Sequence, residues 1–90
     1  MSIPPRAEAA AAGDVRSLLE NIAKALVDDA AQVSVEAVDE GGETVLELQV
    51  APEDVGKVIG KQGRTARALR TILAGVSVKL NRRYTLEILE

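Results

Sequence analysis

The sequence predicts an α+β domain in which helices cover one face of a three-stranded sheet. Two longer segments repeat apolar residues at helical spacing, and three short segments alternate apolar and polar residues with the period of a strand. The chain has 90 residues, of which 47% are hydrophobic, so it can bury one small core. These segments follow the order helix, strand, strand, helix, helix, strand, which predicts two layers and a mixed sheet.

The first helix is predicted to begin at Asp14, whose carboxylate can accept free N–H groups of the first turn. Pro4 and Pro5 disfavour regular structure before it. The alanines that follow could extend the helix backwards, but Gly13 favours a break, so residues 1–13 are expected to be a flexible lead-in and residues 14–90 the domain. The apolar stripe of the helix runs to about Val27 and comprises Val15, Leu18, Leu19, Ile22 and Leu26.

A β-hairpin is predicted next, because the apolar period changes to two. Val33, Val35 and Ala37 alternate with other residues, and a second run from Val45 to Val50 places Leu46, Leu48 and Val50 on one face. The segment "DEGG" at 39–42 joins the two runs, and its glycines can adopt the positive φ of a tight turn.

Two helices and a strand complete the prediction. Pro52 suits the first turn of a short helix that ends at Gly60, and a third helix follows Gly63. The expected inner faces are Val55, Val58 and Ile59 in the short helix, and Ala66, Leu69, Ile72, Leu73, Val76 and Leu80 in the longer one. Gly75 destabilises the longer helix by about 1 kcal/mol relative to alanine, so the sequence does not define the residue at which this helix ends. Tyr84, Leu86 and Ile88 alternate in a last strand, expected to run parallel to the second.

Charge is distributed unevenly along this acidic chain, whose net charge is −3. Residues 1–55 hold three basic residues and twelve acids, whereas residues 56–90 hold eight basic residues and two acids. Five of the basic residues lie in the segment "GKVIGKQGRTARALR" at 56–70, which has no acid. An ordinary solvated surface could produce this asymmetry, but it also suggests an anionic partner for the second half.

The amino-acid composition excludes several kinds of functional site. The chain has no cysteine and no histidine, so disulfides, thiol metal sites and the commonest general base are missing. We therefore expect neither an enzyme nor a cofactor or metal site. No apolar run approaches the ~18 residues of a membrane span, and the N-terminus lacks the features of a secretory signal, which makes the cytoplasm the expected compartment.

The motif "GKQG" at 60–63 connects the two predicted helices. A plain helix–turn–helix corner would explain the two glycines but not the cations around them. A loop without Cβ atoms can approach phosphates closely, and the first N–H groups of the following helix favour anions. Lys57 and Lys61 would add charge at its rim, and Arg64 and Arg67, three apart, could reach neighbouring phosphates. Arg70 is expected on a solvated helix face.

The segment "VAPEDVGKVIGKQGRTARALRTIL" at 50–73 resembles a KH domain, in which a G-x-x-G loop joins two helices and clamps about four nucleotides of a single strand. The whole order of elements resembles the type II arrangement, and residues 14–90 are similar to the bacterial single-domain proteins of the KhpA type. The resemblance implies low-specificity binding of single-stranded RNA through Lys57, Ile59, Gly60, Lys61, Gln62, Gly63, Arg64 and Arg67. It also implies an aliphatic groove built from Val55, Ile59 and the neighbouring strand and helix.

The resemblance further implies an RNA chaperone or post-transcriptional regulator that acts as a homodimer or with a KhpB (Jag)-type KH protein. It links such proteins to cell elongation and envelope homeostasis. Two other functions stay open. The chain could be a helix–hairpin–helix DNA binder, although those motifs use a tighter glycine spacing. It could also be a protein–protein adaptor that docks a partner on its third helix.

Overall fold

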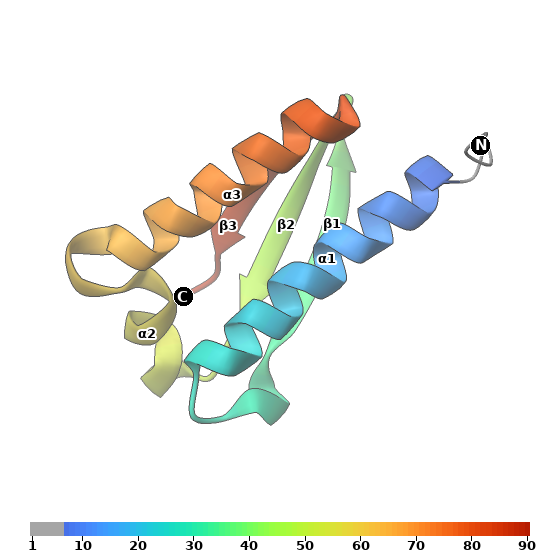
Figure 1. Cartoon of the computed structure of the whole chain (residues 1–90). Coiled ribbons are helices and arrows are strands. Elements are labelled where there is room, and N and C mark those ends of the chain that lie inside the picture. Colours follow the sequence, from blue (N-terminus) through green and yellow to red (C-terminus); the bar gives the residue numbers. More distant parts are fainter. Residues whose placement is uncertain (1–6) are drawn as a thin grey trace.

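The computed structural model describes residues 7–90. Three helices pack on one face of a three-stranded sheet, in the predicted α+β arrangement (Figure 1). The elements, in chain order, are α1 (Ala7–Leu26), the 3₁₀ turn η1 (Ala30–Gln32), β1 (Ser34–Glu40), β2 (Glu43–Gln49), η2 (Pro52–Asp54), α2 (Val55–Ile59), η3 (Lys61–Gly63), α3 (Arg64–Leu80) and β3 (Arg83–Ile88). The order of helices and strands is the predicted one, and α3 runs through Gly75 to Leu80.

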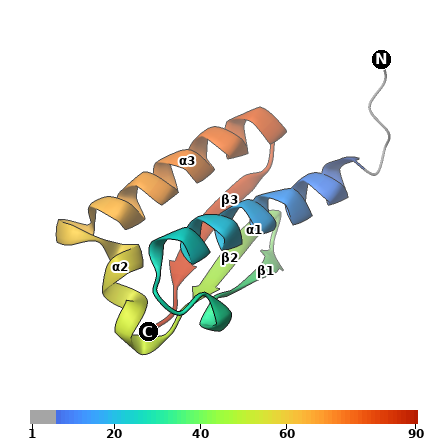
Figure 2. The same ribbon diagram turned by 60° about the horizontal axis from the view of Figure 1, so that its bottom comes forward.

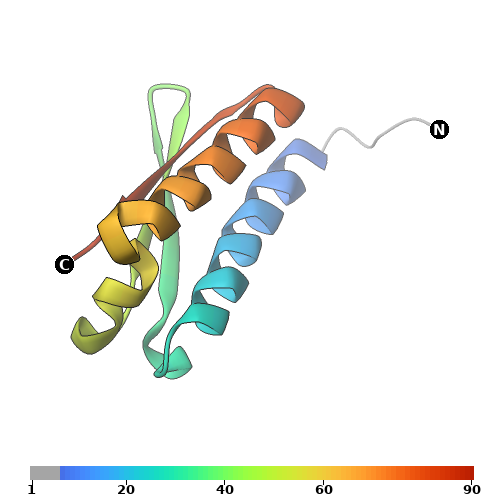
Figure 3. The same cartoon turned by 60° about the vertical axis from the view of Figure 1, so that its left-hand side comes forward.

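The sheet has the strand order β1-β2-β3. β1 and β2 form the predicted antiparallel hairpin, with Val35 opposite Leu48, and β3 joins the other side of β2 in parallel, with Leu86 opposite Leu46. β3 is therefore an edge strand. α1 and α3 lie across the same face of this sheet (Figures 2 and 3), so the opposite face has no helix over it among the described residues.

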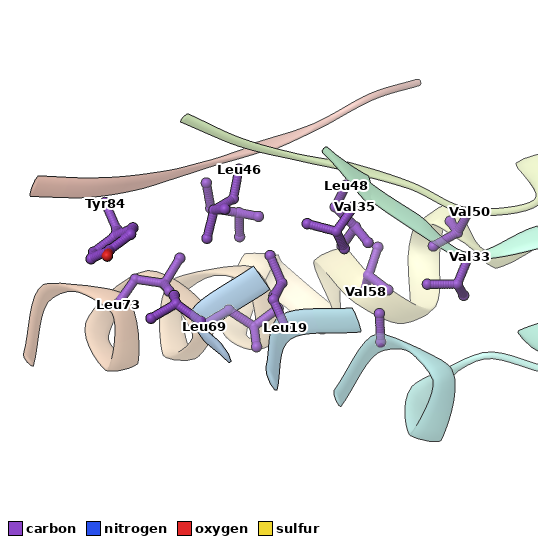
Figure 4. Packing of buried hydrophobic residues seen from close by; sticks show 13 residues of the cluster. Leu19, Val33, Val35, Leu46, Leu48, Val50, Val58, Leu69, Leu73 and Tyr84 are labelled. Atoms are coloured by element: carbon purple, nitrogen blue, oxygen red, sulfur yellow. The ribbon is translucent and has the colours of Figure 1, made fainter. Parts of the chain in front are cut away.

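The core lies between the sheet and the helices (Figure 4). Leu46 and Leu48 on β2 and Val58 on α2 are fully buried. They meet Leu19 from α1 and Leu69 from α3 across the two layers. The alternation predicted for β2 is confirmed, because side chains at every second position of a strand point to one face.

α1 begins earlier than predicted. It spans Ala7–Leu26 and continues through Gly13, which was expected to precede the helix. Alanine has the highest intrinsic helix propensity, so a run of alanines can offset the ~1 kcal/mol cost of one glycine. Residues 1–6, the rest of the expected lead-in, lie outside the described residues.

Three apolar residues predicted for the core are exposed instead. Leu18 and Leu26 on α1 are 44% and 37% exposed, and Ile72 on α3 is 46% exposed. Leu18 and Ile72 lie at the mouth of a narrow apolar seam between the helices, whose floor is Val15, Leu19, Leu69 and Leu73. The helical stripe was wider than the surface that the sheet can cover, so its flanks face solvent. Among residues 7–90, no helix combines the length and apolar character needed to cross a bilayer.

Candidate functional site

The G-x-x-G turn is held by the core on both sides. Val58 anchors α2, and Ala66 and Leu69 anchor the first turns of α3; all three are buried. The N–H of Gly60 donates to the carbonyl of Gly56 at 2.9 Å and ends α2, and the N–H of Gly63 donates to the carbonyl of Gly60 at 3.1 Å. The chain therefore changes direction within the four residues 60–63, between α2 and α3, whose positions are set by their buried side chains.

Three residues of this turn adopt positive φ angles. They are Gly60 (φ 78°), Gln62 (φ 59°) and Gly63 (φ 73°). Gly60 is also packed tightly, because a Cβ atom there would lie only 2.8 Å from the backbone nitrogen of Thr65 and would overlap its side chain. A Cβ at Gly63 would meet nothing within 4 Å, so Gly60 has two reasons to be glycine and Gly63 only one.

The turn presents cations and backbone N–H groups to solvent. Lys61, Gln62 and Arg64 are exposed, and an Arg64 guanidinium N–H donates to Gln62 Oε1 at 3.1 Å. The N–H of Arg64 donates to the carbonyl of Lys61, but no side chain caps the N-terminus of the 17-residue α3, so the N–H groups that follow in the first turn have no side-chain acceptor. A helix start of this kind favours an anion, and the exposed cations beside it favour the same charge.

A groove of about 610 Å³ begins at this turn. Ile59, Gly63, Ala66, Arg67 and Arg70 line it from the loop and helix side, and Leu86, Glu87, Ile88 and Glu90 line it from the side of β3. The loop lies beside the C-terminus of the chain in Figure 1. The groove therefore combines aliphatic side chains, a basic helix wall and the outer edge of a strand.

The groove contains one cation that was not predicted for the site. Arg70 was expected on a solvated helix face, and it is exposed there, but it also lines the groove one turn beyond Arg67. Lys61, Arg64, Arg67 and Arg70 have no carboxylate partner among the described residues. The spacing of three between Arg64, Arg67 and Arg70 was visible in the sequence, but the position of β3 opposite Arg70 was not.

Lys57 and Val55 lie differently from the expectation. Lys57 Nζ is 3.1 Å from Asp54 Oδ1 and 3.1 Å from Asp28 Oδ2, so its charge is paired with carboxylates. At 100° per residue, Lys57 and Ile59 project to roughly opposite sides of α2. Val55 lines a separate hollow with Val33 and Leu89. Of the predicted residues, Ile59, Gly63 and Arg67 line the groove. Gly60, Lys61, Gln62 and Arg64 lie in the turn at its end, and Lys57 lies elsewhere.

Asp54 connects α2 to the end of α1. Its side chain is 3% exposed, and Oδ2 accepts the backbone N–H of Asp29 at 3.0 Å. This hydrogen bond, and after it the one from Lys57, holds the pKa of Asp54 below its ordinary value. The carboxylates of Asp54 and Asp28 in turn raise the pKa of Lys57. We refer to Asp28, Asp54 and Lys57 as the α2 anchor.

Among the described residues, no group of three or more carboxylates is placed to hold a metal ion. The order α-β-β-α-α-β, the mixed sheet and the G-x-x-G turn between two helices define a type II KH domain.

Sequence comparison identifies the branch of this class. The family described as KhpA/KhpB, KH domain, matches residues 16–88, and the chain belongs to this family. It is similar to the RNA-binding protein KhpA of Clostridium acetobutylicum, with 52% identity over 75 residues, which cover 83% of this chain and all of that protein. It is also similar to the RNA-binding protein KhpA of Treponema pallidum, with 51% identity over 73 residues, or 81% of this chain and 91% of that one. The RNA-binding protein KhpA of Aquifex aeolicus is 49% identical over 76 residues, 84% of this chain and 96% of that one.

The two loop glycines should respond differently to substitution. Gly60→Ala is expected to destabilise the protein by about 1–3 kcal/mol, because it adds both backbone strain and overlap with Thr65. Gly63→Asn should cost much less, because asparagine tolerates the left-handed region and the space is open. Urea unfolding of the two variants measures this difference. Equal losses at both positions would contradict the packing role of Thr65.

The α2 anchor should make stability depend on acid. Because the pKa of Asp54 is lowered in the folded state, its carboxylate stabilises the fold above the ordinary carboxyl pKa, near pH 4, and this contribution disappears as the pH falls through the folded pKa. Asp54→Asn should therefore be less stable than the parent at pH 7 and approach it under acid. Glu53→Gln, at the exposed neighbouring position, is the matched control. Urea unfolding between pH 7 and pH 3 tests this, and a difference that does not change with pH would contradict it.

Proposed function

We propose that the protein binds single-stranded RNA in the groove between α3 and β3. The observation that carries this proposal is the exposed G-x-x-G turn at the uncapped start of α3, which opens directly into an apolar groove with a basic wall. The curated relatives that match over most of their length are named RNA-binding proteins, which supports the same function.

The groove suggests how the strand would be held. Phosphates would lie at the turn, where Lys61 and Arg64 and the first N–H groups of α3 offer positive charge. Bases would then enter the groove against Ile59 and Ala66, opposite Leu86 and Ile88. The free edge of β3 offers backbone donors and acceptors at the same place. Few of these contacts distinguish one base from another, so sequence specificity should be low.

Aromatic stacking has no part in this proposal. Tyr84 is the single aromatic residue of the chain and is 4% exposed, inside the core. RRM and OB-type modules bind bases on exposed aromatic rings, and this chain cannot. A helix–hairpin–helix DNA binder remains the competing nucleic-acid function, and competition between single-stranded RNA and duplex DNA separates the two.

One small groove should bind weakly, so we also propose that the protein works in an assembly, either as a homodimer or with a KhpB (Jag)-type KH protein. The seam between α1 and α3 supports this, because Leu18 and Ile72 expose apolar surface there that a partner could cover. The same seam would serve an adaptor function. By resemblance to the family, we place the assembly in the cytoplasm, as an RNA chaperone or post-transcriptional regulator with a role in cell elongation and envelope homeostasis.

The turn is the part of the site that a substitution can remove without harming the core. Lys61→Asp combined with Gln62→Asp should abolish RNA binding and leave the circular dichroism spectrum intact, because both side chains are exposed and aspartate tolerates the left-handed angle at position 62. Binding of a six-nucleotide RNA, measured by fluorescence anisotropy, tests this on a single groove. The parent should show a log–log salt slope of about −2 to −3, for three or four phosphates at about −0.7 each.

A control with the same charge change is Asn21→Asp combined with Lys79→Asp, at exposed positions of α1 and α3 outside the turn. It should bind nearly as the parent does. If the loop variant still binds RNA like the parent, or if the control loses binding equally, the turn is not the site.

The seam should govern assembly. Leu18→Asp combined with Ile72→Asp is expected to prevent self-association, or binding to a KhpB-type protein, because each substitution places a charge on an apolar surface that a partner must desolvate. Analytical ultracentrifugation alone and with that partner measures it. Val78→Asp is the matched control, since Val78 is 84% exposed on another face of α3. A parent that sediments as a monomer and ignores the partner would refute the assembly.

A further inference from the structure

A second hollow continues the proposed RNA groove along the same edge of the molecule. Ala74, Ser77 and Val78 line it from α3, and Arg83, Tyr84 and Thr85 line it from β3, with Gly42, Asn81 and Arg82 at its far end. The first groove uses Arg67 and Arg70 of the same helix and Leu86–Ile88 of the same strand. On β3 the lining residues of the two hollows are consecutive, and on α3 Arg70 and Ala74 are one helical turn apart.

Both hollows lie on one side of α3. At 100° per residue, Arg70, Ala74 and Ser77 project within a single flank of the helix. Each residue adds 1.5 Å along the axis, so Val78 lies about 12 Å beyond Arg70. This distance takes the surface well past the part of the groove next to the G-x-x-G turn.

The second hollow carries features that suit a further stretch of the same strand. Val78 is the most exposed large apolar side chain among those that the structure describes, at 84%, and the burial of such a surface by a base is favourable. Arg83 is exposed and, among the described residues, has no ion-pair partner. Its neighbour Arg82 is different, because Arg82 binds Asp39 at 2.6 Å and Thr44 Oγ1 at 2.9 Å. One arginine thus has a structural role at this corner and the other is free for a ligand.

Acidic side chains limit where the strand can run. Glu43 is paired in register with Arg83, and its carboxylate accepts the Thr85 hydroxyl at 3.1 Å. Glu87 lies in a cross-strand row with Glu47 and Glu36 on the helix-free face of the sheet. Arg83 alternates with the buried Tyr84 and shares this face with Glu87, but it stands at the start of β3, where it also lines the second hollow. The acidic row repels a polyanion from the middle of the face, so the path along α3 and the edge of β3, with Arg83 at its rim, is the favourable one.

We propose that the RNA site does not end at the G-x-x-G groove but continues along the α3–β3 edge, where Val78 and Arg83 bind further nucleotides of the same strand. The inference rests on the proposed function and extends it. A short RNA would occupy the turn and the first hollow, and a longer RNA would add a base on Val78 and a phosphate on Arg83.

The test compares labelled oligouridylates of four and twelve nucleotides, bound to the full chain. The parent should bind the twelve-nucleotide RNA more tightly and with a steeper salt slope. Arg83→Ala combined with Val78→Ser should weaken the longer RNA severalfold and reduce its salt slope by about 0.7, for one lost phosphate contact. It should leave the four-nucleotide RNA unchanged. Circular dichroism checks that the variant is folded.

Lys79→Ala is the matched control, because Lys79 is an exposed cation of α3 about 180° around the helix from Arg70. It should bind both RNAs like the parent. A longer RNA that bridges two copies would depend on Leu18 and Ile72 and not on Val78 and Arg83. The extension is overturned if the double variant binds the longer RNA like the parent, or if both lengths bind equally well. If neither length binds, the proposed function fails with it.

Discussion

The turn between α2 and α3 depends on the close approach of the main chain at Gly60 to Thr65, where a Cβ atom would overlap. α2 must stop at Ile59 so that Val58 can stay in the core, and α3 must start at Arg64 so that Ala66 and Leu69 can pack below it. Joining the two in four residues forces positive φ angles at Gly60, Gln62 and Gly63. The same reversal leaves the start of α3 without a side-chain cap. Tight packing on one side of the turn thus produces an exposed backbone on the other.

Charge is arranged around this turn so that an acidic protein can still receive an anion. The α2 anchor neutralises Lys57 with Asp28 and Asp54, which removes one cation from the site but ties α2 to the end of α1. The cations of the groove wall have no such partners among the described residues. Glu36, Glu47 and Glu87 lie side by side across the open sheet face, and Glu87 and Glu90 also line the groove from the side of β3. Like charges in neighbouring strands cost stability, and their position favours approach of an anion from the helix side.

The sequence predicted what depends on local pattern. The alternation of Leu46, Leu48 and Val50 specified β2, and "GKQG" between two apolar stripes specified the turn, so the fold class and the loop part of the site could be predicted. The predictions that were wrong concern features that depend on the distances between helices and strands. Leu18 and Ile72 share the helical period of their buried neighbours, and only the separation of α1 and α3 exposes them.

The same limit applies to the charges. Lys57 and Arg70 both flank the turn in sequence, but Asp28 pairs with one and β3 forms a groove wall opposite the other. Neither relation has a signal in the spacing of residues. The prediction that α1 begins at Asp14 was wrong for a different reason. The high helix propensity of the alanines outweighed the cost of a single glycine.

α3 links all of these properties, because it presents a different chemistry on each side. Leu69 and Leu73 face the sheet, Ile72 faces the seam beside α1, and Arg70 and Ala74 face the edge of β3. The seam and the proposed RNA path are thus separated by the buried stripe of the helix. A partner on the seam would leave the groove open, and a strand along β3 would leave the seam open. One copy of the protein could therefore gain affinity for RNA in both ways at once. It would make more contacts with the RNA bound along its own groove, and its partner would supply a second groove.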